Sequence, residues 1–461
     1  MLLSIIISII AFLVFFAIFD YYFGASAPIP GIFQIPGSLP FIGNLHQVLD
    51  NPALVYLNWA KKYNVSLFQI RLGNKRIVVA NSCEDVIGLW VNHSCQNNSR
   101  PLYYTFHGIV SATQGFTVGS TPASLTYQRK KKAIGQYLNK KSVDGHSQIL
   151  DNEIKYMIRY LVNQNKFIQL FALVFNKFFF GRKLNLIMLY FQLFALRSSI
   201  FLAYGIHLDC YGKDRELCQE IIDVENKIIR LRSPISNLED SIPILRYIPF
   251  FLGNSKLAKD CGDRRNKYIN HFHQQLVQGI SEGNEDSLKS IVGRMIQTTT
   301  TTSSTQQNQS KSLTESEIQS ICLTLFIPSG THLFMNAYAA NHDAEYFVHP
   351  YQFRPERWID PNTKMIKKSN GFHQHFAFGA GSRMCAGYNL AFKEIYMITL
   401  RLILLFEIHQ PCEEKWLMGL DPFGQNSNPR ATAFEPKVHK VRLNLRELPN
   451  CEVLYEKIFN D

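Results

Sequence analysis

The chain has 461 residues, of which 46% are hydrophobic and 13% aromatic, so it can bury a large core, and a globally disordered protein is excluded. Its formal net charge of +12 is spread over short clusters such as residues 129–132. This distribution favours acidic partners or anionic surfaces only in a general way, and we expect no nucleic-acid partner.

The N-terminal residues 1–19 carry no charge, and an apolar helix of this length spans the roughly 30 Å hydrocarbon layer of a bilayer. We therefore predict a single-pass transmembrane anchor. A cleaved signal peptide is the alternative, because Ala25–Ala27 offers a cleavage site, although the usual basic leading region is missing. Residues 20–45 contain four prolines, which predict a stiff, non-helical tether.

The globular domain is predicted over residues 46–461. Helical periodicity at 51–63 precedes two short strand patterns within 65–82, and the pattern up to about residue 290 is mostly helical. The expected fold class is therefore mainly α with small β-sheets. The polar tract at 298–310 cannot build a core, so it is predicted to be a disordered surface loop.

The stretch 167–196 is dense in Phe and Leu. Lys177, Arg182 and Lys183 interrupt it, so its uncharged runs are short for a second membrane span. A buried helix or a membrane-surface patch is the preferred interpretation.

The nine cysteines are scattered, with no CxxC pair and no Cys/His group at zinc spacing. Such a set is typical of reduced thiols that face a cytosolic compartment. A cysteine with a special role must therefore be identified by its own surroundings.

Cys385 has such surroundings, because it lies in the turn FAFGAGSRMCAG directly ahead of a long apolar helical pattern. Backbone N–H groups and a helix N-terminus favour the thiolate form of cysteine. Gly379, Gly381 and Gly387 allow unusual dihedral angles and the close approach of a flat ligand. Arg383 offers a cation for an anionic group.

Three other interpretations of this turn are weaker. A dinucleotide fingerprint would need glycine where Met384 stands, and no apolar strand precedes the turn. A cysteine nucleophile would need a general base, and His373 and His375 are close only in sequence. A purely structural cysteine would leave the glycines and the arginine unexplained.

The turn resembles the cysteine signature of the cytochrome P450 family, F-x-x-G-x-R-x-C-x-G, at every fixed position: Phe378, Gly381, Arg383, Cys385 and Gly387. The resemblance implies a P450-like haem-thiolate fold in which these five residues bind haem b, iron protoporphyrin IX. Cys385 would be the axial thiolate ligand of the iron, where electron donation favours O–O cleavage. Phe378 would pack beside the ring, Arg383 would pair with a propionate, and Gly387 would let the next helix approach.

Other segments extend the resemblance over most of the chain. NSRP at 98–101, HPYQFRPERW at 349–358 and the proline tether are similar to segments of membrane-bound family members. The resemblance implies a monooxygenase that inserts one oxygen atom from O2 into a small hydrophobic substrate. It also implies an NADPH-dependent P450 reductase as electron donor, contact with membrane lipid, and a location on the endoplasmic reticulum with the globular domain in the cytosol.

The chain departs from the family pattern in its middle. In the family, the distal helix carries a five-residue motif, A/G-G-x-D/E-T, whose acid and alcohol side chains deliver protons. No such motif occurs in this chain. No Glu is followed three residues later by Arg, so the E-x-x-R helix is also missing and Arg357 lacks its expected partner. Residues 313–326 resemble the opening of the distal helix, and residues 327–343 resemble a strand well beyond the E-x-x-R helix. Only 59 positions separate Phe326 from Cys385, too few for the elements that should lie between them. This spacing predicts an internal deletion near 326/327.

A smaller departure concerns the propionate contacts. Leu125 stands where the family has tryptophan, four residues before Arg129. Arg129 therefore meets only part of the family pattern for a propionate contact. Two hypotheses follow from these departures. The chain is a haem-thiolate monooxygenase, or it is an inactive P450-derived relic or defective gene product that at most binds haem.

Overall fold

The computed structural model describes residues 27–113, 115–174, 187–249, 253–301, 331–366 and 375–410, together with shorter pieces between 419 and 446 and several positions between 4 and 15. The helices in this part are α2 (Pro52–Tyr63), α3 (Cys83–Val86), α4 (Leu125–Leu138), α5 (Lys140–Gly145), α6 (Ser147–Val174), α7 (Ile187–Tyr204), α8 (Arg215–Leu231), α9 (Leu238–Ser241), α10 (Gly253–Ser281), α11 (Glu285–Lys289), α12 (Ile291–Thr301), α14 (Ala337–Asn341) and α15 (Tyr388–Leu405). The strands are β1 (Phe33–Gln34), β2 (Leu67–Leu72), β3 (Lys75–Ala80), β4 (His332–Met335), β5 (Phe406–His409) and β6 (Arg442–Leu445). The mainly α fold with small sheets is confirmed.

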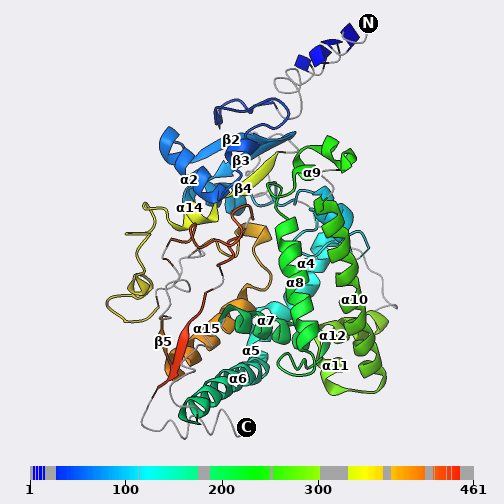
Figure 1. Cartoon of the computed structure of the whole chain (residues 1–461), viewed down its shortest axis with the longest axis vertical. Helices are drawn as coiled ribbons and strands as arrows, with labels where there is room; N and C mark the ends of the chain where they lie inside the picture. The colour runs from blue at the N-terminus through cyan, green and yellow to red at the C-terminus, as the bar shows by residue number, and fades with distance from the viewer. Residues whose placement is uncertain are drawn as a thin grey trace, which may run out of the picture.

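A four-stranded sheet lies at the end of the molecule nearest the N-terminus, with α2 beside it (Figure 1). Its order is β1-β2-β3-β4, with an antiparallel β2–β3 hairpin between two parallel pairings. Gly73 makes the hairpin turn with φ +59, and a β-carbon there would overlap the backbone carbonyl of Ser241. The predicted strand pair is confirmed, and its turn needs glycine.

The largest helical layer is built by α8 and α10, which run side by side below the sheet (Figure 1). The residues of α8 that point inward recur every three or four positions, as expected of an amphipathic helix: Cys218, Ile221, Ile222, Val224, Ile228 and Leu231. They share one apolar cluster with Cys261, Tyr268 and Phe272 of α10.

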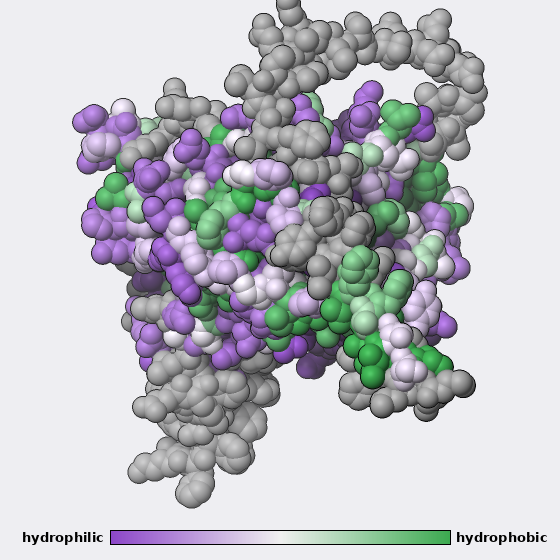
Figure 2. All heavy atoms as spheres, turned by 90° about the horizontal axis from the view of Figure 1, so that it is seen from above, coloured by the Kyte–Doolittle hydropathy of each residue, from purple (hydrophilic) through white to green (hydrophobic). Residues whose placement is uncertain are grey.

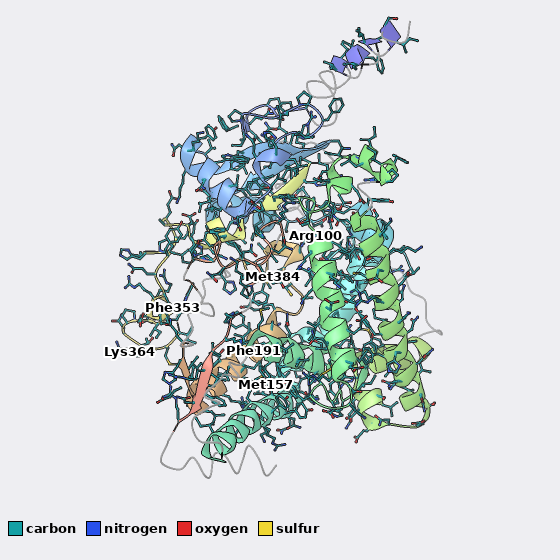
Figure 3. All side chains as sticks on the ribbon, in the orientation of Figure 1. Arg100, Met157, Phe191, Phe353, Lys364 and Met384 are labelled. Atoms are coloured by element: carbon teal, nitrogen blue, oxygen red, sulfur yellow. A yellow bond between two sulfur atoms is a disulfide. The ribbon has the colours of Figure 1, made fainter. Side chains whose placement is uncertain are left out.

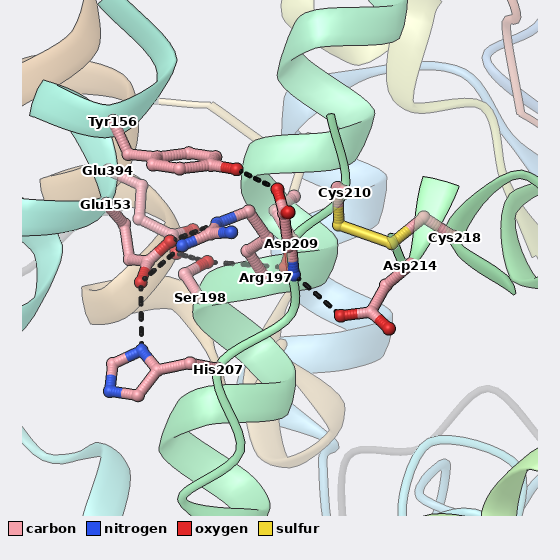
Figure 4. Close-up of polar contacts among 11 residues, drawn as sticks. Glu153, Tyr156, Arg197, Ser198, His207, Asp209, Cys210, Asp214, Cys218 and Glu394 are labelled. Atoms are coloured by element: carbon pink, nitrogen blue, oxygen red, sulfur yellow. Dashed lines mark hydrogen bonds and ion pairs between the residues drawn. A yellow bond between two sulfur atoms is a disulfide. The ribbon is translucent and has the colours of Figure 1, made fainter. Parts of the chain in front are cut away.

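A second apolar cluster holds α15 against α6 through Ile154, Met157, Ile398 and Leu402. A polar network joins the same two helices to α7 (Figure 4). Arg197 Nε donates to Glu153 Oε2 at 2.5 Å, and Ser198 Oγ donates to Glu394 Oε1 at 2.7 Å. Burial raises the pKa of the Glu394 carboxyl.

The cysteine prediction needs a correction, because Cys210 and Cys218 form a disulfide with Cα atoms 5.7 Å apart (Figure 4). The turn that precedes α8 brings Cys210 back onto that helix, an approach that spacing along the chain does not reveal. Cys83, Cys95, Cys261 and Cys385 are free thiols.

The predicted localisation is also wrong. A membrane-spanning helix needs about 20 consecutive apolar residues. Within the part of the chain that the structure describes, no helix is both long and apolar enough to cross a bilayer. This finding contradicts the single-pass anchor on the endoplasmic reticulum; several of residues 1–19 lie outside the described part.

Two further predictions fall partly outside the described residues. The Phe/Leu-rich stretch 167–196 begins in the last turns of α6 and ends within α7, and residues 175–186 between these helices lie outside the described part. The polar tract at 298–310 begins in the last turn of α12, and 302–310 lie outside the described part. On the face seen from the sheet end, hydrophilic and hydrophobic side chains are mixed, and hydrophobic ones gather toward one edge (Figure 2).

Candidate functional site

The cysteine loop, residues 376–387, connects a short coil to the N-terminus of α15. Its backbone folds on itself, since the amide of Cys385 donates to the carbonyl of Phe378 at 2.9 Å. Gly379 and Gly381 both adopt positive φ, +77 and +61. A β-carbon at Gly381 would overlap the carbonyl oxygen of Trp90, so the loop reaches its position only with glycine there.

Cys385 presents a free, exposed thiol near the N-terminus of the 18-residue helix α15. The helix dipole supplies positive potential at this end of α15. By contrast, burial raises the pKa of Cys83 to about 11 and also raises the pKa of Cys261. Cys385 is therefore better suited to hold a metal than these two buried thiols.

Arg383 is held by the loop's neighbours and keeps one nitrogen unused. Its Nη1 donates to the carbonyl of Thr121 at 2.9 Å, its Nε donates to the carbonyl of Asn98, and its guanidinium lies 3.5 Å from the ring centre of Tyr127. Nη2 is buried without a hydrogen-bond partner. Burial lowers the pKa of Arg383, and the charge of Arg100 lowers it further, so an anionic ligand would relieve this site.

Arg100 is the second cation at this place, and the sequence reasoning assigned it no role. It is exposed by its surface area, and in the view of Figure 3 it lies below the sheet near the upper end of α8, with Met384 further down. Its surface is open to a cavity, yet the surrounding protein lowers its pKa. The only signal in the sequence was the NSRP segment at 98–101.

The cavity next to the cysteine loop has a volume of about 590 Å³, within the range of small-molecule sites. We call it the arginine cavity because three guanidinium groups line it, those of Arg100, Arg232 and Arg383. Gly379 and Ala380 of the loop form part of its wall. The rest of the wall mixes aliphatic and polar residues with seven aromatic ones: Tyr56, Trp90, Tyr103, Phe106, Phe334, Tyr338 and Phe434.

One wall of the cavity is fixed by His107, which is buried. The amide of Tyr103 donates to its Nδ1 at 2.9 Å, so the ring proton is on Nε2, which lies 3.2 Å from the carbonyl of Ser120 and donates to it. Burial is the main cause that lowers the pKa of His107, and the neutral ring serves as a structural bridge.

Arg129 is exposed on α4, and none of the contacts described joins it to the loop. The α4 side chains that contact the loop are those of Tyr127 and Lys131, whose hydroxyl and ammonium groups both donate to the carbonyl of Ser382. A propionate contact from Arg129 therefore has no support in the contacts described.

The contacts described for His375 are with its own segment and with α15. Its Nδ1 accepts a hydrogen bond from the amide of Ala377, and its ring lies among Phe378 and Phe392. His373 lies outside the described residues. The cysteine-nucleophile interpretation thus gains nothing from the structure.

Arg357 hydrogen-bonds to its own segment, as expected of an arginine without its E-x-x-R partner. Its guanidinium donates to the carbonyls of Val348, His349, Gln352 and Arg354 at 2.9 to 3.2 Å. These contacts fold the segment around the arginine, which is half-buried.

One face of α15 is apolar and exposed, opposite the face that packs on α6. Ile395, Ile403 and Leu404 are 58%, 54% and 46% exposed, and Phe392, Tyr396 and Leu400 lie exposed beside them. A long helix that is apolar on two faces is typical of one buried between layers.

A family model described as Cytochrome P450 matches residues 34–327 and 325–430. Phenylacetate 2-hydroxylase of Emericella nidulans is 30% identical, with 96% of this chain and 95% of the relative covered. 3-Hydroxyphenylacetate 6-hydroxylase of the same fungus is 32% identical, with 93% and 91% covered. Cytochrome P450 monooxygenase CYP3 of Mycosarcoma maydis is 26% identical, with 89% and 86% covered.

The two family matches meet at residues 325–327. The alignment with the phenylacetate 2-hydroxylase spans 534 positions, whereas this chain has 461 residues. The alignment is thus 73 positions longer than the chain, so at least 73 residues of the relative have no counterpart in this chain.

Proposed function

The chain belongs to the cytochrome P450 family, and from this premise we propose that Cys385 is the axial ligand of its haem iron. The function is that of a haem-thiolate monooxygenase, which inserts one oxygen atom from O2 into a hydrophobic organic substrate. Its cofactor is haem b held by a cysteine thiolate, and a reductase supplies electrons. The exposed, free thiol of Cys385 at the start of α15 is the observation that carries the assignment.

Arg100 and Arg383 would hold the two haem propionates. Both line the arginine cavity, and the two guanidinium groups are close enough for the charge of Arg100 to lower the pKa of Arg383. Two neighbouring cations in a cavity that is partly lined by the cysteine loop suit a flat group that carries two carboxylates. Phe378, Gly381 and Gly387 would shape the loop against the ring.

When bound, haem supplies the activation of O2, which the axial thiolate promotes by electron donation. Arg100 and Arg383 would orient the cofactor, and the aromatic side chains that line the cavity would exclude water from it. For each substrate molecule, one oxygen atom enters the substrate and the other leaves as water. The two electrons would come from NADPH through a P450 reductase.

The substrate would be a small aromatic carboxylic acid of the arylacetate type. Two relatives are named as hydroxylases of phenylacetate and 3-hydroxyphenylacetate, and the cavity combines aromatic side chains with arginines. Aromatic walls suit the ring of such a molecule, and a guanidinium group suits its carboxylate.

The ligand assignment is tested by the carbon-monoxide difference spectrum of the reduced, haem-loaded chain. We expect a thiolate-type band that disappears in Cys385→Ala. The matched control is Cys95→Ala, which removes another free, exposed thiol and should leave the band unchanged. A band that survives in Cys385→Ala would overturn the assignment.

A second candidate function is a haem-binding chain without turnover. Its support is the break in the family match at 325–327, together with the absent acid and alcohol pair and the absent E-x-x-R. Without the pair, no side chain of the distal helix would be in place to deliver protons.

Turnover separates the two candidates. The purified chain is incubated with haem, a P450 reductase, NADPH and phenylacetate, and the product is analysed by mass spectrometry. The second candidate predicts no hydroxylated product above a sample that lacks NADPH; steady product formation would refute it. Sequencing the transcript across codons 326 and 327 shows whether a longer form exists.

A further inference from the structure

We infer that Arg232 binds the carboxylate of an arylacetate substrate in the arginine cavity. The inference rests on the proposed function, whose substrate class it explains by a specific residue. Neither the cysteine signature nor the family match singles out this residue.

Arg232 is the residue that follows α8 as its C-terminal cap. Its guanidinium lies 4.4 Å from the ring centre of Phe106, and both side chains line the arginine cavity. The Nε atom is buried without a hydrogen-bond partner. A stacked guanidinium keeps its fork of N–H donors in one plane, which is the geometry that a carboxylate accepts.

The nearby carboxylate is already in use. Glu225 accepts a hydrogen bond from the hydroxyl of Tyr268 at 2.6 Å and forms an ion pair with Arg265 at 3.1 Å. Burial lowers the pKa of Arg232 and the charge of Arg265 lowers it further, while the charge of Glu225 offsets only part of this effect. Arg232 is thus a desolvated cation whose charge is poorly balanced, and an incoming carboxylate would offset that cost.

The three cavity arginines fall into two groups. Arg100 and Arg383 both interact electrostatically with Tyr127 and with each other, at the cysteine loop. Arg232 instead interacts with Phe106 and Arg265, at the junction of α8 and α10. Two propionates would occupy the first group, so Arg232 remains for a third carboxylate in the same cavity.

The test measures binding by isothermal titration calorimetry on the full chain, with phenylacetate and its neutral analogue phenylacetamide as probes. We expect the chain to bind phenylacetate more tightly than phenylacetamide. Arg232→Gln should weaken phenylacetate binding roughly 10- to 100-fold, as for the loss of a charge-assisted hydrogen bond. Phenylacetamide binding should change less than about threefold on the same reasoning.

The matched control is Arg230→Gln. This arginine lies two residues away and forms an ion pair with Glu435 at the surface, 3.0 Å apart, so its loss should leave both affinities unchanged. If Arg232→Gln does not fold, Arg232→Lys keeps the charge without the planar fork, so it should retain a smaller preference for phenylacetate than the parent.

Three results would overturn the inference: equal phenylacetate affinity in the parent and Arg232→Gln, loss of preference in Arg232→Lys, or no preference for phenylacetate in the parent. These results are independent of the carbon-monoxide band of Cys385. Failure of the haem assignment and failure of the carboxylate site are therefore distinguishable.

Discussion

Replacing Gly381 with alanine probes how tightly the backbone of the cysteine loop is constrained. The residue has φ +61, and an added β-carbon would overlap the carbonyl oxygen of Trp90. The left-handed conformation costs about 1–2 kcal/mol for a residue other than glycine, and overpacking against fixed backbone adds about 1–3 kcal/mol. We expect Gly381→Ala to lower the free energy of unfolding by about 2–5 kcal/mol, a large part of the 5–15 kcal/mol typical of a domain.

Two neighbouring glycines supply graded controls. Gly379 has φ +77 but its nearest surrounding atoms would be 3.9 Å from a β-carbon, so Gly379→Ala should cost only the conformational part, about 1–2 kcal/mol. Gly387 has φ −86, and a β-carbon there would lie 3.8 Å from Cys385 Sγ, so Gly387→Ala should cost less than about 1 kcal/mol.

The assay is urea unfolding followed by tryptophan fluorescence, with the three variants compared at constant slope. The order of destabilisation should be Gly381, then Gly379, then Gly387. Equal losses at all three positions, or a loss at Gly387 as large as at Gly381, would refute the geometry of the loop.

Three further predictions concern pH, the exposed face of α15 and its buried face. Burial lowers the pKa of His332 from 6.5 to about 4, so the unfolded chain binds more protons between these values and stability should fall as pH drops from about 6.5 to 4, by up to about 3 kcal/mol. In His332→Gln, urea titrations at each pH should show a weaker dependence of the unfolding free energy on pH. An unchanged dependence would show that His332 does not cause it. Ile403→Lys, on the exposed face, should change stability by less than about 1 kcal/mol, whereas Ile398→Ala, 7% exposed against α6, should cost about 2–5 kcal/mol. Similar losses at the two positions would show that both faces are covered in solution.

Local features of the fold could be predicted from the sequence, because their causes lie within a few residues. The β2–β3 hairpin follows from two strand patterns around Gly73, and Gly381 combines positive φ with a close backbone contact. The cysteine signature marked the loop that lines the arginine cavity. In each case a short pattern carries its own physical reason.

Features that depend on the tertiary fold could not be predicted in the same way. Arg100 and Arg383 are 283 positions apart in the sequence, and only the packed structure places them on one cavity. The Cys210–Cys218 disulfide depends on a turn that spacing does not reveal. Arg232 resembles any arginine at a helix end until Phe106 and Arg265 are placed around it.

Three separate observations have a common explanation in the middle of the chain. Helix α15 exposes an apolar face, Arg357 bonds only to carbonyls of its own segment among the contacts described, and the family match breaks at 325–327. We propose one cause, an internal segment near 326/327 that the phenylacetate 2-hydroxylase has and this chain lacks, and that contributes to the at least 73 positions of the relative without a counterpart here. Restored at 326/327, such a segment would cover α15, give Arg357 an acidic partner and supply the proton-delivering pair. A restored form that binds haem no better than this chain, and leaves Ile403 exposed, would contradict that proposal.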